Sequence, residues 1–326
     1  METNEIQKKI QELQSLAEKS SVDIESDLKR LQEKINDGGR LSPQDLWKKI
    51  QLARHADRPT TLEIIAAITE SFMEFHGDRY FGDDAAMVGG VGLLDGRAVT
   101  FIGHQKGRNM KENIRRNYGW AHPEGYRKAL RLAKQAEKFG RPVVTFIDTA
   151  GAYPGIASEE RGISEAIARN LKEFAMLKAP VICFIIGEGG SGGAIGIAVG
   201  NEVFMLENSF YTVISPEGCA SILLRDPSKA PEAAAQLKLL PSDLLAFGIV
   251  DGIVPEPEGG AHADHVVAAA NIKAQILDSL KRLETKTGEQ LARERMAKFM
   301  SMGRFVEEGG PKPNFFQRLF SSNRKS

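Results

Sequence analysis

Two segments of this 326-residue chain each join an apolar strand to a glycine-rich loop and then to a predicted helix. The first runs from Val143 to Gly155 and ends in Gly151-Ala152-Tyr153-Pro154-Gly155; the second runs from Val181 to Ala194 and ends in Gly187-Glu188-Gly189-Gly190-Ser191-Gly192-Gly193-Ala194. Apolar runs without polar alternation indicate strands buried on both faces, as in a parallel sheet. Glycine lets main chain approach a ligand closely, and a helix start presents N–H groups without partners. The loops therefore predict two main-chain sites that hold negative charge on oxygen.

The rest of the sequence predicts an α/β core with helical segments on either side. Residues 1–85 are predicted to form a helical N-terminal region, in which apolar spacings of three and four from Ile6 to Ile35 indicate a coiled-coil arm or a helical hairpin. Two further helices are predicted to begin at Ser42, as an N-cap, and at Thr60, which has the spacing of a capping box with Glu63. Strands and helices alternate over residues 86–260, which predicts a largely parallel sheet beginning with a hairpin at Asp95-Gly96. One of these helices is predicted from Ser158 to Leu177. Residues 261–303 are predicted to form C-terminal helices, and residues 304–326 a loosely held tail.

Composition limits the class of protein. Lys+Arg and Asp+Glu both number 43, so no net charge favours a nucleic acid or a membrane surface. No apolar run is long enough to span a membrane, and the first residues have neither a signal-peptide nor a transit-peptide pattern. The two cysteines, Cys183 and Cys219, form no Cys-x-x-Cys pair, and the histidines have no metal-ligand spacing. We therefore expect a cytoplasmic protein with no metal of its own and no nucleic-acid partner.

The second glycine loop also fits two nucleotide-binding patterns in part. Gly187-x-Gly189-x-x-Gly192 followed by Glu207 has the spacing of a dinucleotide fingerprint. However, only about ten residues separate this loop from the next strand, and a dinucleotide-binding crossover needs a longer helix. A phosphate-binding loop of the Walker type is excluded, because Gly192 is followed by Gly193-Ala194 and not by Lys and Ser or Thr.

A nucleophile elbow is a further interpretation of the same loop. Gly189-x-Ser191-x-Gly193 has its spacing, and Asp251, His262 and His265 follow in the order of a serine hydrolase. A scaffold that only binds an acyl-CoA or a carrier domain is another alternative. Both glycine loops could also be tight strand–helix turns that bind nothing.

A dense basic run, Lys106–Arg116, directly follows a predicted strand. Its cations could contact the phosphates of coenzyme A or an acidic partner, and the candidates are Lys106, Arg108, Arg115 and Arg116. The run could equally be a solvated surface loop. The aromatic turn Tyr118-Gly119-Trp120 just beyond it favours an interface.

Five longer motifs resemble one family, the α subunits of the bacterial-type acetyl-coenzyme A carboxylase carboxyltransferase. They are His104–Arg108, Pro123–Ala129, Asp148–Gly155, Gly187–Ala194 and Glu207–Gly218. The resemblance covers nearly the whole chain and is weakest after Arg304. It implies an α/β fold of the crotonase (ClpP/crotonase-like) type, a ββα spiral, with an N-terminal helical extension.

The resemblance also implies a reaction and partners. A carboxyl group would pass from carboxybiotin, held on a biotin carboxyl carrier protein, to acetyl-CoA, giving malonyl-CoA in the first committed step of fatty-acid synthesis. The chain would belong to an α2β2 carboxyltransferase in which the β subunit brings zinc and most of the coenzyme A site. Biotin carboxylase would complete the ATP-binding holoenzyme. Because the cofactor carries the base, the protein would mainly supply position and electrostatics.

The site residues implied by this chemistry lie in the two glycine loops. Gly192, Gly193 and Ala194 are predicted to form the oxyanion hole for the ureido oxygen of biotin. Further substrate-binding residues are predicted in both loops, and these are Gly151, Ala152, Tyr153, Pro154, Gly155, Gly189, Gly190 and Ser191.

Overall fold

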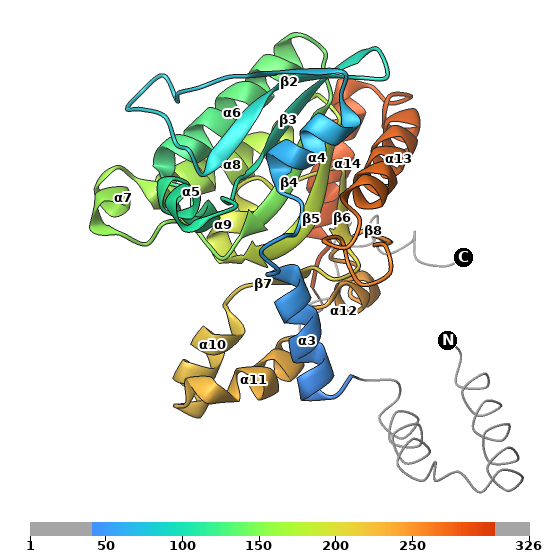
Figure 1. The fold of residues 1–326 in the computed structure, drawn as a ribbon. Coiled ribbons are helices and arrows are strands. Elements are labelled where there is room, and N and C mark those ends of the chain that lie inside the picture. The colour runs from blue at the N-terminus through green and yellow to red at the C-terminus, as the bar shows by residue number, and fades with distance from the viewer. Residues whose placement is uncertain (1–40, 304–326) are drawn as a thin grey trace, which may run out of the picture.

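The computed structural model of the chain describes residues 41–303, which contain one eight-stranded sheet with helices on both faces (Figure 1). The predicted arm or hairpin in residues 1–40 and the predicted tail lie outside these residues. The strand order is β1-β2-β3-β4-β5-β6-β8, and β7 pairs with β5 off this path. The strands are β1 Ser71–Glu74, β2 Met87–Leu94, β3 Arg97–His104, β4 Val143–Thr149, β5 Val181–Gly190, β6 Glu202–Leu206, β7 Phe210–Thr212 and β8 Gly252–Val254.

Several helices begin at the caps that the sequence predicts. The side chain of Ser42 accepts a hydrogen bond from the amide of Asp45, and Thr60 and Glu63 form a capping box. The helices are α3 Pro43–Ala53, α4 Thr61–Ile68, α5 Met110–Arg115, α6 Pro123–Lys138, α7 Ile156–Glu160, α8 Ile163–Met176, α9 Ser191–Ile195, α10 Pro216–Cys219, α11 Ala230–Leu237, α12 Pro241–Ala246, α13 His265–Leu283 and α14 Gly288–Met300.

The sheet begins with antiparallel strands and continues with parallel ones. β1, β2 and β3 pair antiparallel, and the hairpin between β2 and β3 turns at Asp95 and Gly96, whose φ values are 47° and 74°. From β3 onward every pairing, including that of β5 with β7, is parallel. The predicted hairpin and the predicted largely parallel sheet are both confirmed.

A hydrophobic core lies on each face of the sheet. α6 and α8 contribute to one core, and α4 and α13 to the other. Alternate residues of β5 enter the two cores: Cys183 and Ile185 the first, Ile182 and Phe184 the second. This double burial explains why the strand reads as an uninterrupted apolar run.

The sheet extends beyond the boundaries predicted for the core. β1, at 71–74, pairs with β2, and Gly90 permits the contact because a Cβ there would lie 2.0 Å from the carbonyl oxygen of Met73. The C-terminal helices are also integral, since Ile272 is buried and the fully buried Arg295 of α14 donates to the carbonyl of Phe174 in α8. Residues 41–85 and 261–303 therefore pack as parts of one body with the predicted core.

Candidate active site

The two glycine loops lie against each other at the carboxyl ends of β4 and β5. A Cβ on Gly190 would lie 2.0 Å from the carbonyl oxygen of Ala150, and one on Gly193 would lie 2.4 Å from the carbonyl carbon of Gly151. No other residue type allows two main chains to approach so closely. The structure thus brings together the two loops that the sequence identified separately.

The three residues predicted to form an oxyanion hole belong to the first turn of α9. This helix begins at Ser191 directly after β5 with Gly190 as its N-cap, so the amides of Ser191, Gly192 and Gly193 have no acceptor within the helix. Gly192 is half-buried, whereas Gly193 and Ala194 are buried. Of these three residues Gly192 alone is partly exposed, and none of them carries a side chain larger than a methyl group.

The first loop, residues 151–155, has fewer available donors than its length indicates. The amide of Gly151 donates to Oγ1 of Thr149 at 3.1 Å, and the amide of Tyr153 donates to a carbonyl oxygen of the segment before α6 at 3.0 Å. Among the described residues, the amides of Ala152 and Gly155 have no recorded acceptor. Only these two amides of the first loop are therefore available to bind a substrate oxygen.

Side chains from α6 and α8 support α9 from behind. The hydroxyl of Tyr126 donates to the carbonyl of Gly193 at 3.2 Å, and Nδ2 of Asn170 donates to the carbonyl of Gly196 at 3.0 Å. The buried ring of His104 lies beside the main chain of Gly193, and burial lowers the pKa of this imidazole to about 3, so the ring is neutral. The sequence predicts no role for these residues, because a single polar residue on a core-facing helix or strand carries no pattern of its own.

The first loop is also held by a contact between two rings that are tilted relative to each other. The centroids of His122 and Tyr153 are 4.2 Å apart, and Nδ1 of His122 lies 2.7 Å from Oγ of Ser158 in α7. Partial burial and the neighbouring Arg161 lower the pKa of His122. These contacts fix the loop between the start of α6 and the start of α7.

An apolar cavity of about 490 Å3 opens beside the second loop. Lys238 is the one charged residue along its wall. Its lining comes from α9, β7, the ends of α11 and α12 and the segments beside them: Ser191, Gly192, Ile195, Tyr211, Thr212, Val213, Leu237, Lys238, Leu244, Phe247 and Ile249. A flat apolar group can enter this cavity and reach the start of α9.

Two cations of the basic run face carboxylates of the same chain. Nζ of Lys106 lies 2.7 Å from Asp148 and 3.4 Å from Glu188, at the ends of β4 and β5. The guanidinium of Arg108 is paired with Glu63 at the start of α4. Lys106 and Arg108 are therefore neutralised by carboxylates of the same chain.

The other half of the basic run is more exposed. Arg115 is exposed, and Arg116 is half-buried and donates to the carbonyl of Ala85. Large apolar side chains are exposed beside them, namely Met110, Ile114 and Tyr118. This mixture of cations and apolar groups on α5 is typical of a surface that meets a ligand or another chain.

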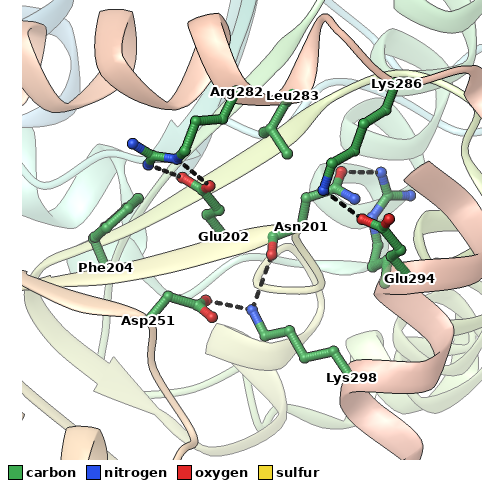
Figure 2. Close-up of a pocket in the computed structure, with 10 residues that line it drawn as sticks. Asn201, Glu202, Phe204, Asp251, Arg282, Leu283, Lys286, Glu294 and Lys298 are labelled. Carbon is green, nitrogen blue, oxygen red and sulfur yellow. Dashed lines mark hydrogen bonds and ion pairs between the residues drawn. The ribbon is translucent and has the colours of Figure 1, made fainter. Parts of the chain in front are cut away.

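The structure does not assemble a catalytic triad on Ser191. Asp251 is paired with a lysine of α14 in a separate cavity at the amino ends of β6 and β8, the opposite edge of the sheet (Figure 2). The ring of His262 stacks on that of His55 with centroids 3.8 Å apart, and Nε2 of His265 lies 2.6 Å from a carbonyl oxygen between α3 and α4. Each candidate partner is held elsewhere, so the serine hydrolase interpretation is wrong.

We expect Ser191→Ala to retain most of the activity. Ser191 is exposed and has a left-handed φ of 51°, and among residues 41–303 no hydrogen bond joins its hydroxyl to a base. Turnover of the purified variant, measured beside wild type, should stay within about threefold, because alanine keeps every main-chain donor. Loss of all turnover in a correctly folded variant would contradict this and restore the serine as a nucleophile.

Solved structures with the same fold support the assignment of the architecture. Transcarboxylase 12S matches with a TM-score of 0.57 at 18% identity, covering 77% of this chain and 44% of the longer chain. A Pseudomonas malonate decarboxylase hetero-tetramer, solved with coenzyme A, matches with a TM-score of 0.56 at 17% identity, covering 72% and 91%. The fold is therefore crotonase-like, as predicted.

Sequence comparison identifies the family within this fold class. The model of the acetyl co-enzyme A carboxylase carboxyltransferase-like family matches residues 1–303. The acetyl-coenzyme A carboxylase carboxyl transferase subunit alpha of Treponema denticola is 55% identical over 295 residues, 90% of this chain and 96% of its own. The subunit of the same name from Listeria welshimeri is 52% identical over 301 residues, 92% and 95%. The chain belongs to the acetyl-CoA carboxylase carboxyltransferase family, which confirms the predicted family and class of enzyme.

The family forms malonyl-CoA by carboxyl transfer to acetyl-CoA and depends on biotin. Within residues 41–303, no group of three or more His, Cys, Asp or Glu side chains is arranged to hold a metal ion. None of the helices in the described part of the chain is both long and apolar enough to cross a membrane.

Proposed function

We propose that this chain is the α half of an acetyl-CoA carboxyltransferase and that its glycine loops hold the carboxybiotin side of the reaction. The contact of Gly190 and Gly193 with the main chain of residues 150–152 carries the proposal. Because of this contact, the main-chain donors of the two loops are neighbours, and those of the second loop lie next to an apolar cavity. Fixed donors of this kind stabilise charge that develops on oxygen during the reaction.

The first turn of α9 supplies the principal donors. The amides of Gly192, Gly193 and Ala194 bind the ureido oxygen of biotin, and the amide of Ala152 or Gly155 supports the neighbouring substrate oxygen. The residues present fit a biotin ring: the cavity beside α9 is apolar, and a Cβ on Gly151 would meet no atom within 4 Å. When bound, carboxybiotin supplies the carboxyl group and the base. The chain supplies orientation, exclusion of water and the fixed donors.

Exposed apolar side chains around the cavity support a β subunit as the partner. Val213 and Phe247 line the cavity and are 79% and 60% exposed, and the π-helical segment 220–224 exposes Ile222 and Leu223. A β subunit covering them would bring the zinc and most of the coenzyme A site, and an α2β2 assembly would receive the biotin carboxyl carrier protein and biotin carboxylase. Obligate interfaces of this kind bury about 2,000 Å2 or more.

We also place the reaction in the cytoplasm. Cys183 and Cys219 are both buried and unpaired, and burial raises the pKa of the Cys183 thiol to about 11. A reducing compartment preserves such thiols.

Formation of malonyl-CoA tests the function directly. The chain, assembled with a β subunit, is mixed with acetyl-CoA and carboxybiotin, and the products are identified by mass spectrometry. We expect malonyl-CoA to form in proportion to the assembled complex. A stable complex that yields no malonyl-CoA would contradict the proposal.

The exposed end of the basic run leads to a second measurement. Reversing Arg115 and Arg116 to Glu should raise the KM for the coenzyme A substrate or the carrier by about tenfold, because cations on an approach surface steer anionic partners. The wild-type KM should rise with salt for the same reason. Arg169→Glu, on the exposed face of α8, is the control. A KM that changes with neither salt nor the double substitution would make the run a solvated surface.

A further inference from the structure

A set of charges lies at the base of the two glycine loops, in which Asp148 and Glu188 are buried and Lys106 is partly exposed. Asp148 is the penultimate residue of β4, and Glu188 stands two residues before the end of β5. Nζ of Lys106, from the segment after β3, lies 2.7 Å from Oδ1 of Asp148 and 3.4 Å from Oε2 of Glu188. One ammonium group therefore joins the ends of the two strands that lead into the loops.

The same charges fill an irregularity between β4 and β5. Ile147 pairs with Ile185, but the next pair is Thr149 with Gly189, so β5 has two more residues than β4 across this interval. Asp148 occupies the irregularity: its Oδ1 accepts the amide of Glu188 at 3.0 Å and would lie 2.7 Å from a Cβ on residue 187. The carboxylate of Asp148 thus takes the place of a main-chain acceptor on β4 at the point where the register between β4 and β5 shifts.

The irregularity sets the relative position of the loops. Ala150 and Gly190, each two residues beyond the network, are the residues whose main chains meet. A shift of β5 relative to β4 at Asp148 would separate them and carry the start of α9 away from residues 151–152.

A second cation completes the network from the opposite side. Nε of Arg54, at the end of α3, lies 2.9 Å from Oε1 of Glu188, and its Nη1 lies 2.5 Å from Glu217 of α10. Burial alone would lower the pKa of Lys106, but Asp148 and Glu188 outweigh it and raise that pKa, so the lysine stays charged. Lys106 is the one cation within ion-pair distance of Asp148 in the described part of the chain.

We propose that Lys106, through Asp148 and Glu188, is a positioning residue that fixes the spacing of the two glycine loops for carboxyl transfer. This inference rests on the function proposed above, because it holds that the spacing of the two loops stabilises the transition state of carboxyl transfer. Lys106 acts on the loops through the strand ends and not by contact with substrate. Its loss should lower turnover more than it weakens substrate binding.

The test compares Lys106→Met with Lys128→Met in the complex with the β subunit. Lys128 is likewise paired with a carboxylate, that of Asp83, but it is fully buried and lies on α6 away from the strand ends. Lys106→Met should lower kcat by about a hundredfold, the effect of misplacing a reacting group by about 1 Å, with KM for acetyl-CoA changed less than threefold. Lys106→Arg should recover at least a tenth of the wild-type kcat. Hydrogen exchange of amides 189–194 should accelerate in Lys106→Met alone.

Other outcomes would overturn the inference. A raised KM that no longer depends on salt, with unchanged exchange, would make Lys106 a ligand contact. Wild-type kcat and exchange in Lys106→Met would remove its role altogether. If Lys106→Met does not fold, Glu188→Gln should still lower kcat with little change in KM, and its failure to do so would also overturn the inference. If the wild-type complex itself forms no malonyl-CoA, the proposed function fails, while the exchange measurement still decides whether Lys106 spaces the loops.

Discussion

Replacing Gly193 with valine is expected to lower turnover by about a hundredfold to a thousandfold, the usual effect of losing one oxyanion-hole donor. A Cβ at this position would lie 2.4 Å from the carbonyl carbon of Gly151 and 2.5 Å from the amide nitrogen of Ala152. Both neighbours are main chain, which cannot rotate away, so the two loops must separate. The branched side chain would also cover the amide that we assign to the ureido oxygen.

The comparison variant is Gly192→Ala, one residue earlier in the same turn. A Cβ there would meet only Cδ1 of Ile167, at 3.6 Å, which is an ordinary contact, and the amide remains. We expect this variant to lose far less turnover than Gly193→Val. Steady-state rates are measured on the assembled enzyme, and thermal unfolding confirms that both variants fold. Near-normal turnover of folded Gly193→Val would show that the loop contact has no role in the reaction.

The features of the fold that the sequence predicts correctly depend on neighbouring residues. The cap at Ser42, the capping box of Thr60 and Glu63 and the turn at Asp95-Gly96 each involve residues within four positions of one another. Caps and tight turns form from such local hydrogen bonds and φ preferences, so the pattern is sufficient.

Features that depend on distant contacts, or on a backbone angle that the residue type does not fix, were missed or misplaced. β1 has only four residues, and its place in the sheet depends on the close approach that Gly90 allows. The helix predicted from Ser158 to Leu177 is broken into α7 and α8 at Gly162, whose φ of 80° ends the first helix. One glycine within a helical pattern does not reveal its own φ.

The candidate site divides in the same way. Glycine-rich loops after apolar strands predict main-chain donors, and the structure places those loops together. The availability of each donor was not predictable, because the amide of Gly151 is used by Thr149 only in this loop conformation. The partners of Lys106 were also hidden, because the irregularity that brings Asp148 and Glu188 together depends on the pairing register of β4 and β5.

The purified chain alone is expected to show no turnover, and addition of a β subunit should restore it completely. The glycine loops supply donors for one side of the reaction, but the apolar cavity beside them is open, with Val213 79% exposed and Phe247 60% exposed at its wall. Charge stabilisation by fixed donors is strong only where water is excluded, so an open site loses most of its effect. Covering these side chains would complete the site and exclude water.

The assay follows decarboxylation of malonyl-CoA with free biotin as acceptor, so no carrier protein is needed. The chain is measured alone and then with increasing β subunit, and activity should rise until the two are equimolar. Val213→Asp, at an exposed apolar position, should require more β subunit to reach the same rate, because a charge buried at an apolar contact weakens association. The cavity in the isolated chain is open to water. Full activity without any β subunit would therefore mean that the loops exclude water by themselves, and the proposal that the site is divided between the two subunits would be wrong.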